Sequence, residues 1–261
     1  MKKNSHLISI IMNCHNGEKF LEQSIKSIIS QSYKKWELIF WDNQSKDKSA
    51  EIVKNFKDPR VKYFKGNKLV NLYAARNLAL KKASGKYISF LDTDDIWDKN
   101  FLSAHLKKII KDSCDIVYSK FLVFEERKKR VYLNYKKNLR SGYITQNLLD
   151  RYNVGIVAVM LKRSIFNKHK FDGKYQIIGD FDFFIRLSMK YNFCFLNFPL
   201  ATYRYHNLSF TNQNIEIYYK EFKTWFKENE KKLKKEKYNL IRLKLYFFKI
   251  GFKNYLNKIF Y

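Results

Sequence analysis

The chain has few cysteines and no long apolar segment. Its 261 residues include only Cys14, Cys114 and Cys194, an odd number without close-paired spacing. This pattern argues against a disulfide framework or a zinc site, and we expect buried free thiols in a reducing compartment. The apolar run Leu7–Met12 is too short for a signal peptide or a membrane span. We therefore expect a cytoplasmic protein.

Acidic residues are scarce relative to basic ones. The chain carries 52 Lys and Arg against 24 Asp and Glu, a formal net charge of +28. Such a charge requires anionic surroundings, whether nucleic acid, phospholipid head groups or a phosphorylated substrate. The basic residues form no recognisable RNA- or DNA-binding motif, so no nucleic acid partner is expected. With 46% hydrophobic residues the chain can form a full core, and we do not expect disorder.

Short apolar runs alternate with helical patterns over the first part of the chain. The runs predict strands, and apolar residues spaced every three or four positions predict helices. This order implies a parallel sheet with helices on both faces, whose ligands bind beyond the carboxyl ends of the strands. The predicted strands are Leu7–Met12, Trp36–Trp41, Val61–Phe64 and Tyr87–Leu91, and the predicted helices are Phe20–Ser30, Ser49–Phe56, Leu72–Ala83 and Asn100–Lys111.

The fourth predicted strand ends in a concentration of carboxylates, Asp92-Thr93-Asp94-Asp95. This much negative charge needs solvent or a cation to neutralise it, and hard oxygen ligands on one short loop suit Mg²⁺ or Mn²⁺. These ions keep open positions for phosphates, so an Asp-x-Asp at a strand end indicates a nucleotide-diphosphate site. Taken alone, the motif is more often a polar turn in which one aspartate caps the next helix.

Polar residues also follow the first two predicted strands, in the segments Asn13–Gly17 and Asp42–Asp47. Each segment has a simple structural explanation, since the first can form a turn at Asn16 and the second can cap a helix through Ser45. Three acceptor-rich loops at successive carboxyl ends are harder to explain separately. Together they predict one shared nucleotide-binding cleft.

Five segments of the N-terminal part form a recognisable set: Ser9–Gly17, Gln31–Ile39, Trp41–Asp47, Ala74–Ala79 and Gly85–Trp97. Together they resemble the family 2 glycosyltransferases, nucleotide-sugar enzymes with a GT-A fold. Weaker matches follow at Gly179–Leu187 and around Tyr203–His206.

The resemblance implies an α/β GT-A fold, in which a mostly parallel, Rossmann-like sheet carries helices on both faces. Residues 1–210 would form the catalytic domain, divided into a nucleotide-binding half (1–118) and an acceptor half (119–210). Residues 211–261 match no family that we can name and are rich in lysine and aromatic residues. They predict a basic amphipathic helical extension.

The resemblance assigns the nucleoside to the first two loops. The loop of Asn13, His15 and Asn16 would hold it, with the His15 ring where the family usually has an aromatic residue. Asp42 would accept the imide N–H of uracil. Arg76 would stabilise the base or the diphosphate through its planar, permanently charged guanidinium, although a helix-surface cation is the alternative.

The diphosphate and sugar are assigned to the carboxylate loop and a later segment. Asp92 would approach the ribose and the sugar, with Thr93 beside it, and Asp94 would bind the metal. Family members often carry an Arg-x-His that folds over the diphosphate, which here is Arg204 and His206. His206 could be a metal or phosphate ligand, or a structural histidine.

Sugar transfer also needs a base that takes the acceptor hydroxyl proton. The family usually opens a helix with a Glu-Asp pair at this point, and here Gly179 stands in the place of the glutamate. We predict Asp180 as the base. Its alternative role is to cap the helix Phe181–Tyr191, and Asp182 is a weaker candidate for the base.

These features predict an inverting, non-processive glycosyltransferase that uses a nucleoside-diphosphate sugar, with UDP preferred, and Mg²⁺ or Mn²⁺. The acceptor would be a surface glycan or a lipid-linked saccharide. Non-processivity is inferred because the chain shows no transmembrane segment and no Gln-x-x-Arg-Trp motif after the base. The alternatives are a catalytically inactive GT-A protein that binds sugar or nucleotide, and a nucleic-acid-binding protein. A nucleotidyltransferase is disfavoured because the first loop has one glycine and no cation.

The C-terminal extension has two explanations that the sequence leaves open. Its apolar residues could contact a membrane while lysines face anionic head groups, which would place the protein at the inner face of the cell membrane. Alternatively, they pack on the catalytic domain and the lysines face solvent. The apolar residues concerned are Trp225, Phe226, Leu243, Phe247, Phe248, Phe252 and Tyr255.

Overall fold

The computed structural model describes residues 6–206 and 210–260, and within these ranges nine strands form one mixed sheet. The strands are β1 (Ile8–Cys14), β2 (Trp36–Asp42), β3 (Val61–Lys65), β4 (Tyr87–Phe90), β5 (Ile96–Trp97), β6 (Ile116–Glu125), β7 (Arg130–Leu133), β8 (Val159–Lys162) and β9 (Phe193–Tyr205). Their order in the sheet is β3-β2-β1-β4-β8-β6-β9-β5, with β7 beside β6.

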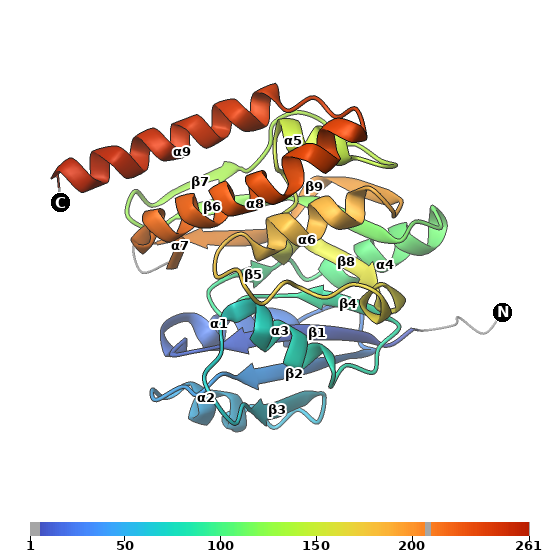
Figure 1. Ribbon diagram of the computed structural model, residues 1–261. Coiled ribbons are helices and arrows are strands. Elements are labelled where there is room, and N and C mark those ends of the chain that lie inside the picture. Colours follow the sequence, from blue (N-terminus) through green and yellow to red (C-terminus); the bar gives the residue numbers. More distant parts are fainter. Residues whose placement is uncertain (1–5, 207–209, 261) are drawn as a thin grey trace.

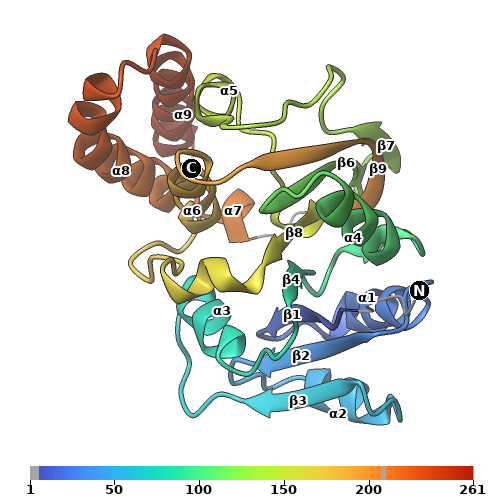
Figure 2. The same cartoon turned by 90° about the vertical axis from the view of Figure 1, so that its right-hand side faces the viewer.

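Helices cover both faces of this sheet. Figure 2 shows α3 and α6 on one side, and α1, α2 and α4 on the other. The helices are α1 (Glu18–Ile29), α2 (Ser49–Asn55), α3 (Leu72–Leu80), α4 (Phe101–Lys111), α5 (Thr145–Asp150), α6 (Gly179–Ser188), α7 (Phe210–Gln213), α8 (Ile215–Lys235) and α9 (Ile241–Phe260), with short 3-10 helices at η1 (Ile156–Ala158) and η2 (Arg163–Asn167).

The first half of the sheet follows the order predicted from the sequence. Strands β3, β2, β1 and β4 run parallel, and every predicted helix and strand is present with bounds that differ by a few residues at most. Strands β1 and β2 are buried along their whole length because helices cover both faces. The register pairs Cys14 with Asp42, so the first two polar loops leave the sheet at the same level.

The second half of the sheet is mixed, as the order and directions of its strands show. Strand β8 runs antiparallel to both β4 and β6, and β5 runs antiparallel to β9, while β6 and β9 are parallel. Strand β7 returns on β6 as a hairpin. Between α4 and α6 the chain forms the β6–β7 hairpin, passes through α5 and η1, and returns as β8 antiparallel to β6.

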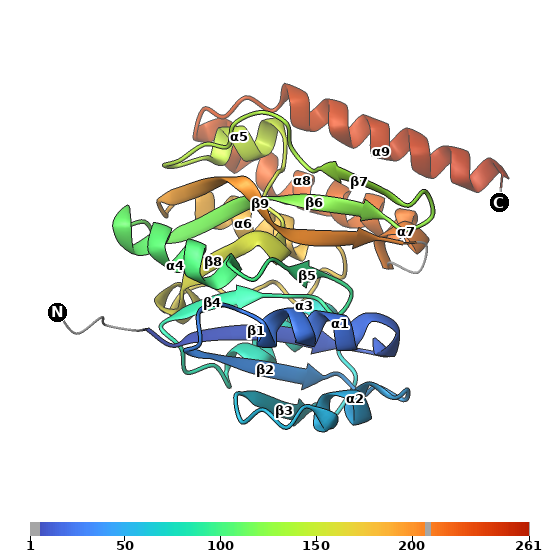
Figure 3. The same cartoon turned by 180° about the vertical axis from the view of Figure 1, so that it is seen from behind.

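The core is divided by the sheet into two clusters. One lies under α1 and α4 (Figure 3) and the other under α3, α5, α6, α8 and α9 (Figure 1). The second cluster contains Phe222 and Trp225 from α8 and Leu243 from α9. The aromatic residues of α8 therefore complete the catalytic domain, as the packing alternative for the extension predicts.

Helix α9 has one packed face and one exposed face. Leu243, Phe247 and Ile250 turn toward the core or α8, whereas another stripe of apolar residues faces solvent. Within the part of the chain that the structure describes, no helix is both long and apolar enough to cross a bilayer. The side chain of Tyr255 lies outside the described residues. The exposed stripe consists of Ile241, Leu245, Phe248 and Phe252.

The cysteines correct one expectation and confirm another. Cys114 precedes β6 and Cys194 lies in β9; their Cα atoms are 6.0 Å apart and their sulfur atoms are joined as a disulfide. The pairing arises because β6 and β9 are neighbours, with Val117 opposite Cys194. The prediction of free thiols is wrong for this pair and confirmed for Cys14, which is buried and unpaired.

Candidate active site

The first two polar loops are bound to each other. The backbone N–H of Asn16 donates to the Ser45 hydroxyl (3.1 Å), and the Asn16 side chain accepts from the Lys46 N–H (2.9 Å). Asn16 has a left-handed φ of 56°, which asparagine tolerates better than most residues. The Gly17 N–H donates to the Ser49 hydroxyl (3.0 Å). Asn16 thus joins the two loops, and its predicted contact with the nucleotide stays a prediction.

The carboxylate loop packs against the first loop through Gly17. A Cβ atom on Gly17 would lie 2.9 Å from Thr93 Oγ1 and 3.0 Å from Cys14 Sγ, so only glycine permits this approach. The Ser24 hydroxyl lies 2.8 Å from the carbonyl oxygen of Thr93 and 2.7 Å from that of Asp95. The three strand-end loops thus form one surface, as their order in the sequence predicts.

Two residues predicted to contact the nucleoside differ in their hydrogen bonding: Asp42 has partners inside the protein, and Asn13 has none among the described residues. Asp42 is 1% exposed, and its carboxylate accepts from the Ser45 N–H (2.7 Å) and the Tyr63 hydroxyl (2.5 Å). The Asn13 side chain is 8% exposed, and neither of its amide atoms has a partner among the described residues. Because an amide carries one donor and one acceptor group, Asn13 matches the carbonyl and imide N–H of uracil. His15 lies close by, with its Nδ1 3.0 Å from the Asn43 carbonyl oxygen.

Arg76 is buried and pairs with Asp92, and its predicted role toward the base or the diphosphate stays a prediction. Its side chain is 2% exposed, and Nη2 donates to both oxygens of Asp92, at 2.7 and 3.0 Å. The guanidinium also lies near the rings of Tyr73, Phe90 and Phe171. These contacts fix the orientation of the Asp92 side chain at the cleft.

Asp94 and His206 form the second polar pair of the cleft, with Nε2 and Oδ2 2.9 Å apart. Burial raises the pKa of the Asp94 carboxyl, and the nearby charge of Asp92 raises it further. Two carboxylates in one partly buried loop favour the arrival of a cation. His206 contacts Asp94 in this structure, and its role as a metal ligand stays a prediction.

Arg204 lies beside the same loop. Its Nε donates to the Asp94 carbonyl oxygen (3.0 Å), and its guanidinium is held near the rings of Phe20 and Phe124. The backbone N–H of Arg204 donates to the buried Asp95 carboxylate (2.8 Å). Asp95, which we had not assigned a role, therefore fixes β9 against the carboxylate loop and brings Arg204 and His206 into the cleft.

The donor groups suit a metal that arrives with a diphosphate. Over residues 6–206 and 210–260, no group of three or more His, Cys, Asp or Glu is arranged to hold an ion. Mg²⁺ and Mn²⁺ are commonly bound by one or two carboxylates together with substrate phosphates and water. Asp94, with Asp92 and His206 adjacent, provides this partial set.

The predicted base lies at the start of α6. Asp180 Oδ1 accepts from the Phe181 N–H (2.8 Å) and lies 3.3 Å from the Tyr73 hydroxyl. Burial raises the pKa of the Asp180 carboxyl, and Arg76 partly offsets this. A raised pKa makes the carboxylate a stronger base near neutral pH. Asp180 is the second residue of α6, whose N-cap position is Ile178 without a side-chain cap, so Asp180 does not cap this helix and its role as the base stays a prediction.

Gly179 is explained by Tyr73. A Cβ atom on Gly179 would lie 2.5 Å from the Tyr73 ring, so the ring occupies the space that a glutamate side chain would need. The Tyr73 hydroxyl also donates to the Ile177 carbonyl oxygen (2.6 Å), just before α6. Tyr73 and Gly179 lie far apart in the sequence, so no local pattern pointed to this contact.

Asp182 has a structural role. Its carboxylate accepts from the Trp225 indole N–H (3.1 Å) and pairs with Arg186 (2.8 Å), and the residue is buried. Both oxygens are occupied by these contacts. This leaves Asp180 as the aspartate of α6 that faces open space.

A cavity of about 470 Å³ lies between the carboxylate loop and α6. Asp92 and Asp95 line one side, Asp180 lines another, and the loop Arg151–Val157 closes it together with aromatic side chains of β6 and β9. The volume is in the range of small-ligand sites. The carboxylate expected near the donor sugar and the predicted base therefore face the same space.

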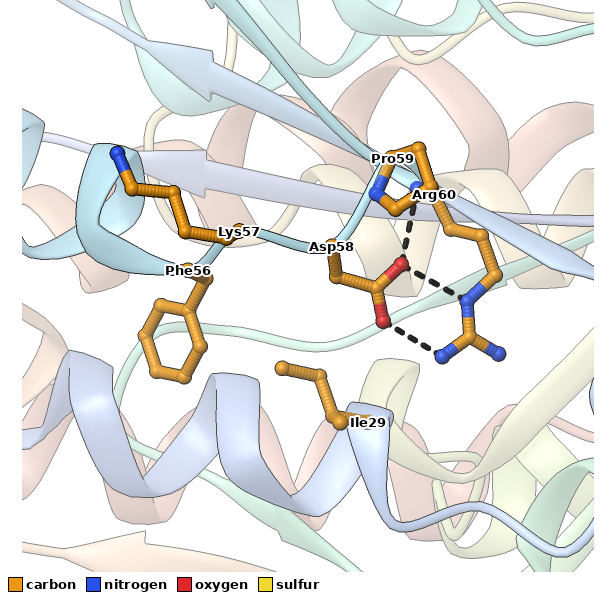
Figure 4. Close-up of a pocket in the computed structure, with 6 residues that line it drawn as sticks. All are labelled: Ile29, Phe56, Lys57, Asp58, Pro59 and Arg60. Carbon is orange, nitrogen blue, oxygen red and sulfur yellow. Dashed lines mark hydrogen bonds and ion pairs between the residues drawn. The ribbon is translucent and has the colours of Figure 1, made fainter.

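A separate hollow of about 500 Å³ lies at the amino end of β3 (Figure 4). It is lined by Ile29 and by the segment from Phe56 to Arg60. Asp58 and Arg60 form an ion pair there (2.6 Å), and the Arg60 guanidinium stacks over Trp36. Its charged groups are satisfied, and none of the strand-end loops contributes to it, so we place it outside the site.

Residues 9–169 match the profile described as "Glycosyl transferase family 2", which covers more than half of the chain. The chain belongs to this family. The Escherichia coli protein "UDP-Glc:alpha-D-GlcNAc-diphosphoundecaprenol beta-1,3-glucosyltransferase WfgD" is 34% identical over 64% of this family 2 chain and 64% of its own length. An uncharacterized glycosyltransferase of Methanocaldococcus jannaschii is 30% identical over 77% of the chain and 71% of its own length.

Solved structures confirm the GT-A-like fold of this family 2 protein. Staphylococcus aureus TarS in complex with UDP-GlcNAc superposes with a TM-score of 0.64 at 16% identity, over 81% of this chain and 64% of that one. The Pyrobaculum calidifontis mannosyltransferase PcManGT, in complex with GDP-Man and Mn²⁺, gives a TM-score of 0.64 at 14% identity, over 86% and 65%. At these identities the likeness concerns the fold.

Proposed function

We propose that this protein is a metal-dependent, inverting and non-processive glycosyltransferase that takes its sugar from a UDP-linked donor. The observation that carries the proposal is the shared cavity, which Asp92 lines beside the strand-end loops and Asp180 lines from α6. Asn13 supports the nucleotide assignment, because its buried amide atoms have no partner among the described residues. The unit concerned is residues 1–210 together with the helices that pack on it.

In this mechanism, the acceptor hydroxyl attacks the anomeric carbon while the bond to the diphosphate oxygen breaks. The hydroxyl proton passes to the Asp180 carboxylate, and direct displacement inverts the anomeric configuration. Arg76 orients Asp92 toward the donor sugar. Asp94, with His206, would hold Mg²⁺ or Mn²⁺, which when bound would neutralise the leaving diphosphate.

The acceptor that we propose is a lipid-linked saccharide. The E. coli relative is named for transfer to a diphosphoundecaprenol-linked GlcNAc. The net charge of +28 suits an anionic acceptor and an anionic surface. A catalytically inactive protein is the second candidate, motivated by Gly179. Because Tyr73 fills the space of the missing glutamate and Asp180 is retained, the active enzyme is favoured.

A thermal-shift panel of nucleotides and nucleotide sugars, with and without Mn²⁺, tests the donor. UDP and one UDP-sugar should raise the Tm by several degrees at concentrations far above Kd, since ligands that bind the native state stabilise it. Asn13→Ala should remove most of this shift. Asp58→Ala, in the distant hollow, should leave it unchanged. A shift with GDP alone would reject the UDP donor, and none with any nucleotide would reject the enzyme.

We also propose that α9 attaches the protein to an anionic membrane. Its exposed stripe of Ile241, Leu245, Phe248 and Phe252 repeats at helical spacing, and lysine and arginine residues flank it. The full chain should co-sediment with anionic liposomes at low salt and not with neutral ones, and Phe248→Ser should weaken this. Phe198→Ser, at an exposed phenylalanine outside α9, is the control. If the full chain did not bind liposomes but formed dimers that Phe248→Ser dissociates, a second copy would cover the stripe.

A further inference from the structure

A second cavity, of about 560 Å³, adjoins the first. It lies among α5, the start of α6, α8 and α9, and three residues line both cavities: Arg151, Tyr152 and Asp180. Helices α8 and α9, which lie side by side in Figure 1, form its outer wall. The predicted base is therefore reached from two directions, the carboxylate loop on one side and the C-terminal helices on the other.

The lining of this cavity is divided by chemistry. Its apolar wall includes Leu149, Ile178, Phe181, Phe222 and Leu243. A lipid chain can contact such a surface without leaving polar groups unsatisfied.

Two cations stand at the same cavity. Arg151 and Lys249 are both exposed, and Lys249 has no ion-pair partner among the described residues. Two carboxyl groups also line the cavity: Asp180, the predicted base, and Asp150, which accepts from the Gln146 amide (2.9 Å) and lies 4.0 Å from Arg242, which offsets its charge. Hydroxyl groups of Tyr218 and Tyr246, 2.7 Å apart, bridge α8 and α9 at the cavity wall.

Tyr152 marks the passage between the two cavities. The residue lines both spaces, and its buried hydroxyl has no hydrogen-bond partner among the described residues. A buried hydroxyl left unpaired is costly, and a saccharide hydroxyl would satisfy it. The cavity thus combines the unpaired hydroxyl of Tyr152 and the carboxyl of Asp180 with two cations and an apolar wall.

We infer that this second cavity binds the acceptor as a saccharide–diphosphate–lipid, with the saccharide toward Tyr152 and Asp180, the diphosphate at Arg151 and Lys249, and the first part of the lipid on the apolar wall. This inference rests on the proposed function and adds the place and the groups that recognise the acceptor. The guanidinium of Arg151 and the ammonium group of Lys249 are both suited to bind a diphosphate. The exposed stripe of α9 would keep the lipid end near a bilayer.

The test uses the full chain and farnesyl diphosphate, an isoprenyl diphosphate, below its aggregation concentration. Binding is measured by calorimetry with saturating UDP and Mn²⁺, so that the donor site is filled. We expect binding under these conditions, and weaker binding of both farnesol and inorganic diphosphate. Arg151→Ala and Lys249→Ala should each raise the Kd at least about tenfold, because each removes a charge-assisted contact.

The matched control is Lys223→Ala, which removes an exposed lysine of α8 that does not line the cavity. It should change the Kd by less than about twofold. An equal rise for Lys223→Ala, or no rise for Arg151→Ala and Lys249→Ala, would overturn the inference. Loss of farnesyl diphosphate binding when UDP is added would place the probe in the donor site and also overturn it. Failure of the UDP thermal shift would instead reject the proposed function, which this binding assay leaves separate.

Discussion

The two halves of the site are held in place in different ways. The donor side consists of loops that follow parallel strands. The loops after β1 and β2, which are adjacent strands, are joined by contacts such as that of Asn16 with Lys46. The acceptor side depends on α8, far along the chain. Glu221 accepts from the N–H groups of Gln176, Ile177 and Ile178 just before α6. The donor site is thus a product of strand order, whereas the position of the base depends on long-range packing.

Helix α8 of the C-terminal extension supports the helix that carries Asp180. Trp225 donates to Asp182 from α8 and so secures α6 from the side, while Glu221 secures its beginning. A truncation before α8 would therefore remove the support of Asp180. Helix α8 packs into the core, whereas α9, within the part of the chain that the structure describes, carries a stripe of exposed apolar residues.

On the donor side, we expect the largest loss of turnover from the substitution of Asp94. Asp94→Ala should lower kcat by at least about 10³-fold, because neutralising a leaving diphosphate is worth several kcal/mol. The fold should remain intact, since Asp94 is partly exposed at the end of a loop. The measurement is transfer from a UDP-sugar with added Mn²⁺, and EDTA should reproduce the loss in the parent. Full activity in excess EDTA would contradict a metal-dependent donor site.

On the acceptor side, Asp180→Asn should lower kcat by at least about 10²-fold, the usual contribution of a general base, while the Kd for UDP stays unchanged. Asp182→Asn should instead lower the Tm, because it weakens the contacts with Trp225 and Arg186. Turnover and Tm are measured for both variants. If Asp182→Asn lost turnover and Asp180→Asn kept it, the base would have to be reassigned.

The pH dependence of Asp180 gives the same assignment a second readout. Since burial raises the pKa of Asp180 in the folded protein, its protonated form favours the native state, and that stability is lost as the pH rises through the raised pKa. Catalysis needs the carboxylate, so kcat/KM of the parent should increase over the same pH interval. Asp180→Asn should not show this increase of kcat/KM with pH, and it should be no less stable than the parent at neutral pH.

The support from α8 is tested by Glu221→Ala. Three backbone N–H groups would lose their acceptor, which should cost about 1–3 kcal/mol of folding free energy and lower turnover more than UDP affinity. Denaturant unfolding and kinetics provide the two readouts. Glu228→Ala on the same helix removes an exposed ion pair with Lys174 and should cost less than about 1 kcal/mol. Equal losses in the two variants would remove the special role of Glu221.

The smallest expected effect concerns the glycine that replaces the family's glutamate. Gly179→Ala should destabilise the fold by about 1–3 kcal/mol, because its Cβ would press on the Tyr73 ring. Tyr73→Ala costs stability by itself, but in that background the alanine at 179 should cost little. A double-mutant cycle measures this coupling. Additive effects would mean that Tyr73 does not explain the glycine.

The local sequence determined the parallel half of the sheet and its three polar loops. Continuous apolar runs such as Ile8–Met12 bury on both faces, and the polar residues that follow them must lie at one edge. The roles that depend on neighbouring side chains could not be read in this way. Asp42 is bonded to Tyr63 and Arg76 to Asp92, contacts that the sequence did not predict, and their predicted roles toward the nucleotide stay predictions.

After the first hundred residues, tertiary structure decided which segments pair and pack with one another. Antiparallel pairing of β8, the disulfide between Cys114 and Cys194, and the support of α6 by Glu221 all join segments far apart in the chain. Periodicity within a segment carries no information about such partners. It predicted helices in the C-terminal segment, but only packing decided that α8 turns its aromatic residues inward and that α9 leaves an apolar stripe in solvent, because burial depends on which surface lies opposite.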